Sequence, residues 1–321
     1  MHLTRFASSL RLLIAVFAVG AASGCSIQRF AVNKVGDALA GGGGTYAADD
    51  DPELVRAAIP FSLKLIESLL ESSPRHEGLL LTAASGFTQY SYAFVQQDAD
   101  DLEDRDFQRA QELRDRARRL YLRARDYGLR GLDARHSDIT GALRRSPADA
   151  LAATRADDVP FLYWTAVAWA AAIGVSKDDP QLIGDLAIVD ALINRALDLD
   201  DTFDFGAIHA FLITYSLAGM DAIDVQAATA RRHFTRAVEL SGGNLAAPYV
   251  SFAESVCVRI AHRQEFTELL EQALAIDPNA KRDWRLSNLI MQKRARWLLA
   301  RRDELFLPSE APRNIKESAG D

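Results

Sequence analysis

The chain has 321 residues, of which 49% are apolar and 25% are charged, as is typical of a soluble globular protein. Its 44 acidic residues outnumber the 37 basic ones, and the formal net charge is −7. An acidic chain of this kind binds nucleic acid poorly, so we expect no nucleic-acid partner. Ala and Leu dominate the apolar positions, and Val, Ile and Thr form no alternating runs, which predicts an all-α fold.

The first 24 residues have the pattern of a signal peptide. Arg5 and Arg11 form a basic start, and residues 12–22 are an apolar core too short for a membrane span of ~20 residues. The motif "ASGC" then places Cys25 at the cut, where an ordinary cleavage site needs no cysteine. It resembles the lipobox of bacterial lipoproteins, which implies a lipidated Cys25. The alternative is a soluble secreted protein with an accidental cysteine.

Residues 25–50 connect this anchor to the folded body. Apolar residues at helical spacing over 27–40 predict a short amphipathic helix, and Gly41 to Gly44 predict a flexible linker. Ser26, in place of Asp, resembles the sorting signal for the outer membrane. Asp51 as N-cap and Pro52 at the first helical position mark the start of a helical-repeat domain over residues 51–306.

The sequence of the body predicts a series of helices. The third predicted helix ends at Gly128, since glycine often terminates helices. Residues 307–321 are polar and contain proline, which predicts a disordered tail. The predicted helices are 52–72, 76–97, 106–127, a segment capped by Ser146, 158–174, 181–199, 203–218, 223–240, 246–261, 263–276 and 280–303.

Internal repeats organise these helices. The segments "LINRALDLDDTF", "HFTRAVELSGGN" and "LLEQALAIDPNA" share one pattern, and their alanines Ala196, Ala237 and Ala273 are separated by 41 and 36 residues. A similar segment surrounds Leu69. The pattern is similar to the end of a tetratricopeptide repeat, whose period is 34 residues. We therefore predict about four degenerate tetratricopeptide-like helical hairpins that stack into a right-handed, solenoid-like bundle.

The segments that identify a family lie within residues 30–132. They are "FAVNKVGDALAGGGG", "DDDPELVRAAIPFSLKLIESLL", "GLLLTAASGFTQYSYAFVQQDADDLE" and "RARRLYLRARDYGLRGL". These segments resemble the T-component family of tripartite ATP-independent periplasmic (TRAP) transporters. The resemblance implies a periplasmic lipoprotein of tetratricopeptide-like repeats, associated with the TRAP solute-binding (P) subunit. It also implies a homotrimer and a cavity or pore accessible to a small ligand.

Patterns that would indicate an enzyme or a metal site are missing from the sequence. The six histidines contain no HExxH pair, and no glycine-rich loop has phosphate-binding form. The acidic run over residues 98–104 lacks the glycine and terminal glutamate of a calcium loop. We therefore expect no catalytic residues, no cofactor and no metal.

Two groups of residues are candidates for binding. The first is aromatic: Phe87, Tyr90 and Phe94 share one helix face, and Phe161 and Trp164 share another, with Tyr163 and Trp169 turned elsewhere. These side chains could simply form the core. They could instead line a ligand cavity, in which Gln89 and Gln96 would be polar contacts.

The second group is a run of arginines over residues 114–130. Arg116, Arg119, Arg123 and Arg130 form one stripe, and Arg114, Arg118 and Arg125 form another. The simpler interpretation is that they are solvated or paired with nearby acids. TRAP systems commonly move organic acids. The resemblance therefore adds a second interpretation, in which Arg116, Arg119 or Arg123 contacts an anionic ligand or partner.

The favoured hypothesis is an accessory TRAP component that binds the solute-binding subunit and passes or shelters a small organic ligand, acidic or apolar. The alternative is a generic tetratricopeptide-type scaffold in envelope assembly, without a ligand of its own. A periplasmic enzyme has little support, because no catalytic cluster is found.

The anchor gives a first prediction. The variant Cys25→Ala should release the mature protein from the membrane fraction without unfolding it, because the glycines separate the anchor from the body. Fractionation followed by circular dichroism of the released protein measures both effects. A released variant that fails to fold would show that residues 26–40 belong to the core.

Overall fold

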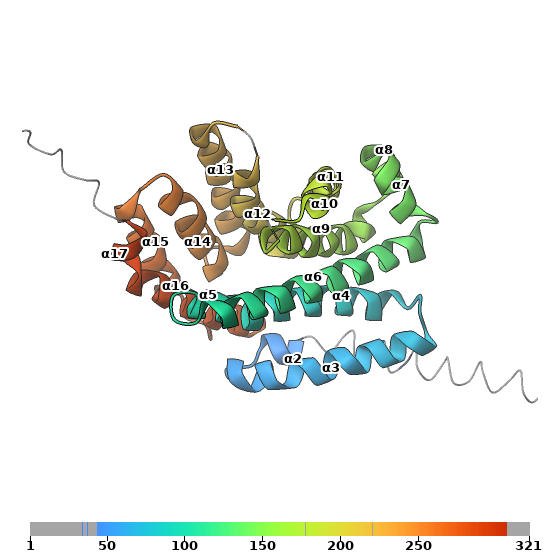
Figure 1. The fold of residues 1–321 in the computed structure, drawn as a ribbon, viewed down its shortest axis with the longest axis horizontal. Coiled ribbons are helices and arrows are strands. Elements are labelled where there is room, and N and C mark those ends of the chain that lie inside the picture. Colours follow the sequence, from blue (N-terminus) through green and yellow to red (C-terminus); the bar gives the residue numbers. More distant parts are fainter. Residues whose placement is uncertain (1–33, 35–36, 38–43, 177, 220, 307–321) are drawn as a thin grey trace, which may run out of the picture. The chain divides into compact units, whose positions relative to one another are not determined.

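The structure is a computed structural model, which describes residues 34, 37, 44–176, 178–219 and 221–306. Throughout this described part the regular secondary structure is helical, and no strand is present (Figure 1). The predicted all-α class is therefore confirmed. Cys25, most of residues 26–43 and the tail from residue 307 lie outside the described residues. Of the predicted linker only Gly44 is described, and it begins α2 (Gly44–Ala47).

The body divides into two compact units, with the boundary after Asp200. Unit 1 holds residues up to Tyr46 and residues 51–200; unit 2 holds Ala47–Asp50 and the chain from Asp201 onward. In unit 1, α3, α4, α6, α9 and α11 pack successively against one another. The helices of unit 1 are α3 (Pro52–Ser72), α4 (Glu77–Ser91), the π-helical turn η1 (Tyr92–Gln96), α5 (Gln97–Leu102), α6 (Phe107–Arg135), α7 (Ile139–Arg145), α8 (Pro147–Leu151), the 3-10 turn η2 (Ala156–Asp158), α9 (Val159–Gly174), α10 (Pro180–Gly184) and α11 (Leu186–Leu199).

Unit 2 is built from helical pairs. Helix α12 packs on α13, α14 packs on α15, and α16 covers both α14 and α15. The short segment 47–50 joins this unit through Arg285, whose Nη1 donates to the carbonyl of Ala48 at 3.1 Å. The elements of unit 2 are α12 (Phe203–Tyr215), the 3-10 turn η3 (Ser216–Ala218), α13 (Ile223–Ser241), α14 (Ala246–Phe252), the π-helical turn η4 (Ala253–Cys257), α15 (Arg263–Ala275), the 3-10 turn η5 (Arg282–Trp284), α16 (Arg285–Ala300) and α17 (Arg302–Leu305).

Helix α3 has the bounds that its capping residues predict. The Asp51 carboxylate accepts hydrogen bonds from the backbone N–H groups of Glu53 and Leu54, each at 3.0 Å, and Pro52 occupies the first helical position. One face of α3 is buried. On the exposed side, a strip of residues at alternating spacings of four and three contains no charged residue and exposes large apolar side chains, with Phe61 73% exposed. The members of this α3 strip are Leu54, Ala58, Phe61, Leu65, Ser68 and Ser72.

Helix α6 corrects the sequence-based boundary. We predicted that Gly128 ends this helix, but α6 continues through Gly128 to Arg135. The reason is close packing on α9: a Cβ added at Gly128 would lie 2.2 Å from Thr165 Oγ1, and one at Gly131 would lie 2.0 Å from Phe161 Cε1. These glycines are therefore required by the neighbouring helix and do not terminate their own.

Several other boundaries differ because short polar turns interrupt the predicted helices. The segment 181–199 is divided into α10 and α11 at Asp185, and 280–303 is divided into η5, α16 and α17. Helix α7, with its apolar residues Ile139 and Leu143 buried, was not predicted from the sequence. It is only two turns long, and so short a helix leaves little periodicity to recognise.

A pair of histidines lies between α12 and α13. The Nδ1 atoms of His209 and His233 are 2.9 Å apart, so one ring donates an N–H and the other accepts it. Burial lowers the pKa of both, and the proximity of His209 contributes to lowering the pKa of His233 to about 4. Asp201, whose carboxylate lies 3.9 Å from His209 Nε2, acts in the opposite direction and favours a higher pKa for His209. The other charged groups facing the pair are Arg232 and Arg236.

The glycine contacts predict the effect of added side chains. The variant Gly131→Ala should lower the free energy of unfolding by roughly 1–3 kcal/mol, because the new Cβ would overlap the Phe161 ring. Gly174→Ala, at a position with no atom within 4 Å of the added Cβ, is the matched control and should change stability little. Urea denaturation measures both, and equal effects would contradict the packing argument.

The histidine pair predicts acid sensitivity. Because the folded-state pKa of His233 lies below its unfolded value of about 6.5, the unfolded chain takes up protons first as the pH falls. Stability that is present above pH ~6.5 should therefore be lost between pH ~6.5 and ~4. Urea denaturation across this range should show a shallower loss for His233→Gln than for wild type. The exposed His262→Gln is the control, and identical slopes for all three proteins would refute the prediction.

Candidate functional site

The predicted aromatic and arginine groups meet in unit 1. Phe87, Tyr90 and Phe94 project from α4 and η1, and all three side chains are buried. Each ring lies beneath a guanidinium group from a neighbouring helix, at a distance typical of cation–π contact. The pairs are Phe87 with Arg123 at 5.4 Å, Tyr90 with Arg116 at 5.8 Å and Phe94 with Arg56 at 5.0 Å. We call these six residues the arginine–aromatic seam.

Arg56 fixes one end of the seam. Its Nη1 donates to the carbonyl of Phe94 at 3.3 Å, and its Nη2 donates to Asp98 Oδ1 at 3.0 Å. The second guanidinium contact, to Asp98 Oδ2, completes a bidentate pair between α3 and α5. The hydrogen bond to Asp98 raises the pKa of Arg56, so this guanidinium stays charged. Arg56 therefore serves the structure and is not free to bind a partner.

Glu67 of α3 organises the other end. Its Oε1 accepts a hydrogen bond from the Tyr127 hydroxyl at 2.8 Å, and Lys64 donates to its Oε2 at 2.6 Å. Arg123 Nη1 lies 3.6 Å from Oε1. Burial alone would raise the pKa of Glu67, but the hydrogen bonds from Lys64 and Tyr127 outweigh it and lower the pKa. Glu67 therefore remains a carboxylate in the folded protein.

Tyr127 links this carboxylate to the aromatic row. Its ring stacks on Phe87, with centroids 6.0 Å apart and planes 9° from parallel. Burial, followed by the hydrogen bond to Glu67, raises the pKa of Tyr127 to about 12. The hydroxyl therefore stays protonated and keeps donating to Glu67 at physiological pH. Neither Tyr127 nor Glu67 was predicted as a site residue, since nothing in a helical pattern indicates that two residues sixty positions apart share a hydrogen bond.

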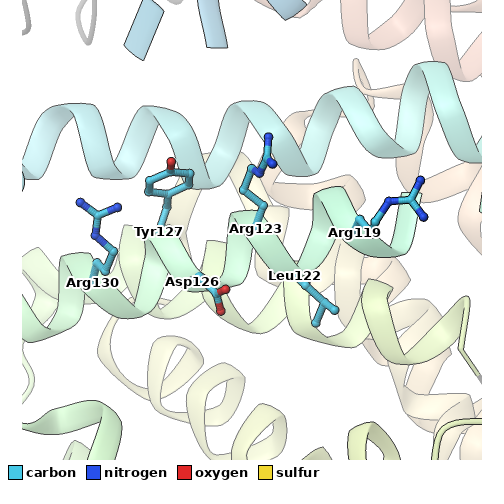
Figure 2. A pocket seen from close by; sticks show the side chains of 6 residues that line it. All are labelled: Arg119, Leu122, Arg123, Asp126, Tyr127 and Arg130. Atoms are coloured by element: carbon cyan, nitrogen blue, oxygen red, sulfur yellow. The ribbon is translucent and has the colours of Figure 1, made fainter. Parts of the chain in front are cut away.

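The exposed face of α6 carries a shallow hollow of about 390 Å³ (Figure 2). Its lining comes from one helix alone: Arg119, Leu122, Arg123, Asp126, Tyr127 and Arg130. Figure 2 shows the three arginines and Tyr127 on one side of α6, and Leu122 and Asp126 on the other. Arg130 lies over the Tyr127 ring at 5.1 Å and donates to the carbonyl of Pro74 at 3.1 Å. Asp126 is paired with Arg125 through two hydrogen bonds.

The two predicted arginine stripes differ in their partners. The stripe of Arg114, Arg118 and Arg125 is paired with acids, namely Glu103 at 2.8 Å, Asp179 at 2.6 Å and Asp126 at 2.7 Å. In the other stripe, Arg123 approaches Glu67, whereas Arg116, Arg119 and Arg130 have no carboxylate partner among the described residues. Of the two interpretations, pairing with acids therefore describes the first stripe better than the second.

The remaining predicted aromatic residues lie on α9. Tyr163 and Trp169 are buried and Trp164 is half-buried; Tyr163 and Trp164 meet edge to face at 4.9 Å. Trp169 lies under Arg125 of α6, also at 4.9 Å. The buried polar atoms Thr165 Oγ1 and Trp169 Nε1, one turn apart, have no hydrogen-bond partner among the described residues. Both atoms lie where α9 packs against α6.

The two predicted glutamines lie in different surroundings. Gln96 Oε1 accepts a hydrogen bond from the buried Tyr121 hydroxyl at 2.7 Å, so it supports the junction of η1 and α6. Gln89 is exposed, and its side chain donates to the carbonyl of Ser85 at 3.3 Å. The structure thus joins Gln96 to the core of unit 1 and leaves Gln89 at the surface. Cys25, the predicted lipidation site, lies outside the described residues.

The described part of the chain is all-helical, and α6 carries a row of exposed arginines. The chain belongs to the TRAP transporter T-component family, which it matches over residues 48–306. The family predicted from residues 30–132 is thereby confirmed. A protein of Treponema pallidum (strain Nichols), named only as uncharacterized, is 30% identical over 307 residues, which cover 89% of this chain and 94% of the relative.

Among the described residues, no helix combines the length and apolar character needed to cross a membrane. Nor does any group of three or more His, Cys, Asp or Glu side chains within this described part come together in a way that could hold a metal ion.

Proposed function

We propose that this chain is an accessory periplasmic component of a TRAP transporter that binds the solute-binding (P) subunit. In this role it shelters a small organic ligand, acidic or apolar, or passes it through an internal cavity. The observation that carries the proposal is the family match over residues 48–306. The protein acts by binding and performs no catalysis of its own.

The aromatic residues of α9 are the candidates for the ligand site. Trp169 Nε1 is a buried polar atom without a partner among the described residues, and burying such an atom unsatisfied costs about 1–3 kcal/mol. A ligand with a hydrogen-bonding group beside Trp169 would satisfy it, whereas the contact of Thr165 with Gly128 has no room for a ligand. Trp169, Tyr163 and Trp164 would supply the aromatic surface, and Phe87, Tyr90 and Phe94 are further candidates.

The repeat architecture finds support in the buried alanines. Ala196, Ala237 and Ala273, the shared positions of three sequence repeats, lie near the ends of α11, α13 and α15 and are each at most 1% exposed. Stacked tetratricopeptide-like hairpins require a small buried residue at the same position of each repeat, because small residues allow neighbouring helices to approach closely. We propose that these repeats form a right-handed solenoid-like bundle.

Self-association into a homotrimer is part of the proposal. The α3 strip supports it, since Leu54, Phe61 and Leu65 are exposed large apolar side chains on a strip without charged residues. A spacing of four and three residues is the pattern of helices that pack along a shared seam. Placement at the outer membrane through a lipid on Cys25 completes the proposed arrangement.

Co-purification tests the proposal. The mature protein, carrying a tag, should retain the solute-binding subunit of the same transporter, and candidate organic acids should change the amount retained. Native mass spectrometry of the eluate should show a trimer of this chain. Absence of any complex, with and without organic acids, would refute the transporter role and favour a generic scaffold in envelope assembly.

A further inference from the structure

Four arginines form a straight row on α6, which we call the arginine stripe: Arg116, Arg119, Arg123 and Arg130. At 100° per residue they fall within an arc of about 60°, and at 1.5 Å per residue they span about 21 Å. All four are exposed, and α6 contains no lysine. The stripe is therefore a line of guanidinium groups along the outer face of one helix.

Aromatic rings hold three of these guanidinium groups in place. Arg116 lies over Tyr90 and donates to its hydroxyl at 3.3 Å, Arg123 lies over Phe87, and Arg130 lies over Tyr127. A side chain that is already ordered loses less entropy when it binds a partner. The rings thus prepare the stripe for binding, because they position the charges without neutralising them.

The charge of the stripe is largely uncompensated. Arg116 and Arg130 make hydrogen bonds only to neutral oxygens, and Arg119 has no hydrogen bond or ion pair with the described residues. This contrasts with the other arginines of α6, which are paired with acids. On a chain whose net charge is −7, such a row is a local positive feature that attracts acidic groups.

The geometry favours a protein partner over a small acid. A small-molecule site buries most of its ligand, but the hollow here is shallow and is lined by a single helix. A row about 21 Å long also exceeds the reach of one small dicarboxylate. The spacings of three, four and seven residues match the spacing of side chains on a second helix laid along α6.

The same face disfavours an anionic bilayer. Glu112 lies on it, four residues before Arg116, and a membrane surface would meet this carboxylate together with the arginines. Mixed signs around an arginine row are typical of protein interfaces, where arginine is enriched and pairs with carboxylates in bidentate fashion. Membrane-binding clusters instead rely on uninterrupted Lys and Arg.

We infer that the arginine stripe of α6 is the docking surface for an acidic face of a protein partner, with carboxylates spaced along one of its helices. The inference rests on the proposed function, in which that partner is the solute-binding subunit. Each guanidinium would receive one carboxylate, with Arg119 and Arg116 free to do so without losing an existing ion pair.

The test compares charge reversals inside and outside the stripe. Arg119→Glu and Arg116→Glu should each raise the Kd for the solute-binding subunit about tenfold or more, and the wild-type Kd should rise between about 0.05 and 0.3 M NaCl. The matched control is Arg296→Glu, an exposed arginine on α16 with no hydrogen bond or ion pair among the described residues. It should leave the Kd within about twofold. Circular dichroism checks that all variants are folded.

A second probe separates this inference from the proposed function. Fluorescent poly-L-glutamate should bind the wild type and lose affinity in Arg119→Glu but not in Arg296→Glu. If the solute-binding subunit fails to bind while poly-L-glutamate binds through the stripe, the proposed function fails and the docking surface stands. The inference is overturned if the subunit binds all variants equally, or if poly-L-glutamate binds them equally or not at all. Binding through the stripe to phosphatidylglycerol vesicles, with none to poly-L-glutamate, would also overturn it in favour of a membrane surface.

Discussion

The close approach of α6 to α9 is the constraint on which unit 1 depends. Gly128 and Gly131 lie against Thr165 and Phe161, with no room for even one added carbon atom. This contact uses one face of the 29-residue helix, and the four arginines lie on another face that is exposed. Polar side chains can therefore line the outside of α6 at no cost to its packing. The division into a glycine face and an arginine face explains how one helix serves both the core and the surface.

Local signals predicted some of the fold correctly because they act within a few residues. Asp51 and Pro52 fixed the start of α3, since a cap and a pre-set φ angle work without help from the rest of the chain. The end of α6 was wrong because Gly128 was judged as a helix terminator. Its actual role depends on Thr165 of another helix, and no property of a single helix reveals such a neighbour.

For the candidate site as well, the sequence predicted features within one helix and left contacts between helices open. Spacing alone placed Phe87, Tyr90 and Phe94 on one face and four arginines on another, and the structure brings these faces together. The sequence left open which arginines are paired, because the partner Glu67 lies on α3 and the partner Asp179 lies just before α10. Family membership, by contrast, was recognisable from residues 30–132 alone, because it follows from whole segments and not from the pairing of distant side chains.

The π-helical turn η1 has a consequence for how this family can vary in length. A π turn closes its hydrogen bond over one residue more than an α turn, so η1 holds one residue in excess of regular helix. Deleting one residue from η1 would restore the α-helical repeat and leave the helix beyond it in register, so Asp98, two residues past η1, would still face Arg56. Deleting one residue from the regular part of α4 would instead rotate everything beyond it by about 100° and turn Asp98 away from Arg56. η1 is therefore the place where this helical segment tolerates a change of one residue without separating α3 from α5.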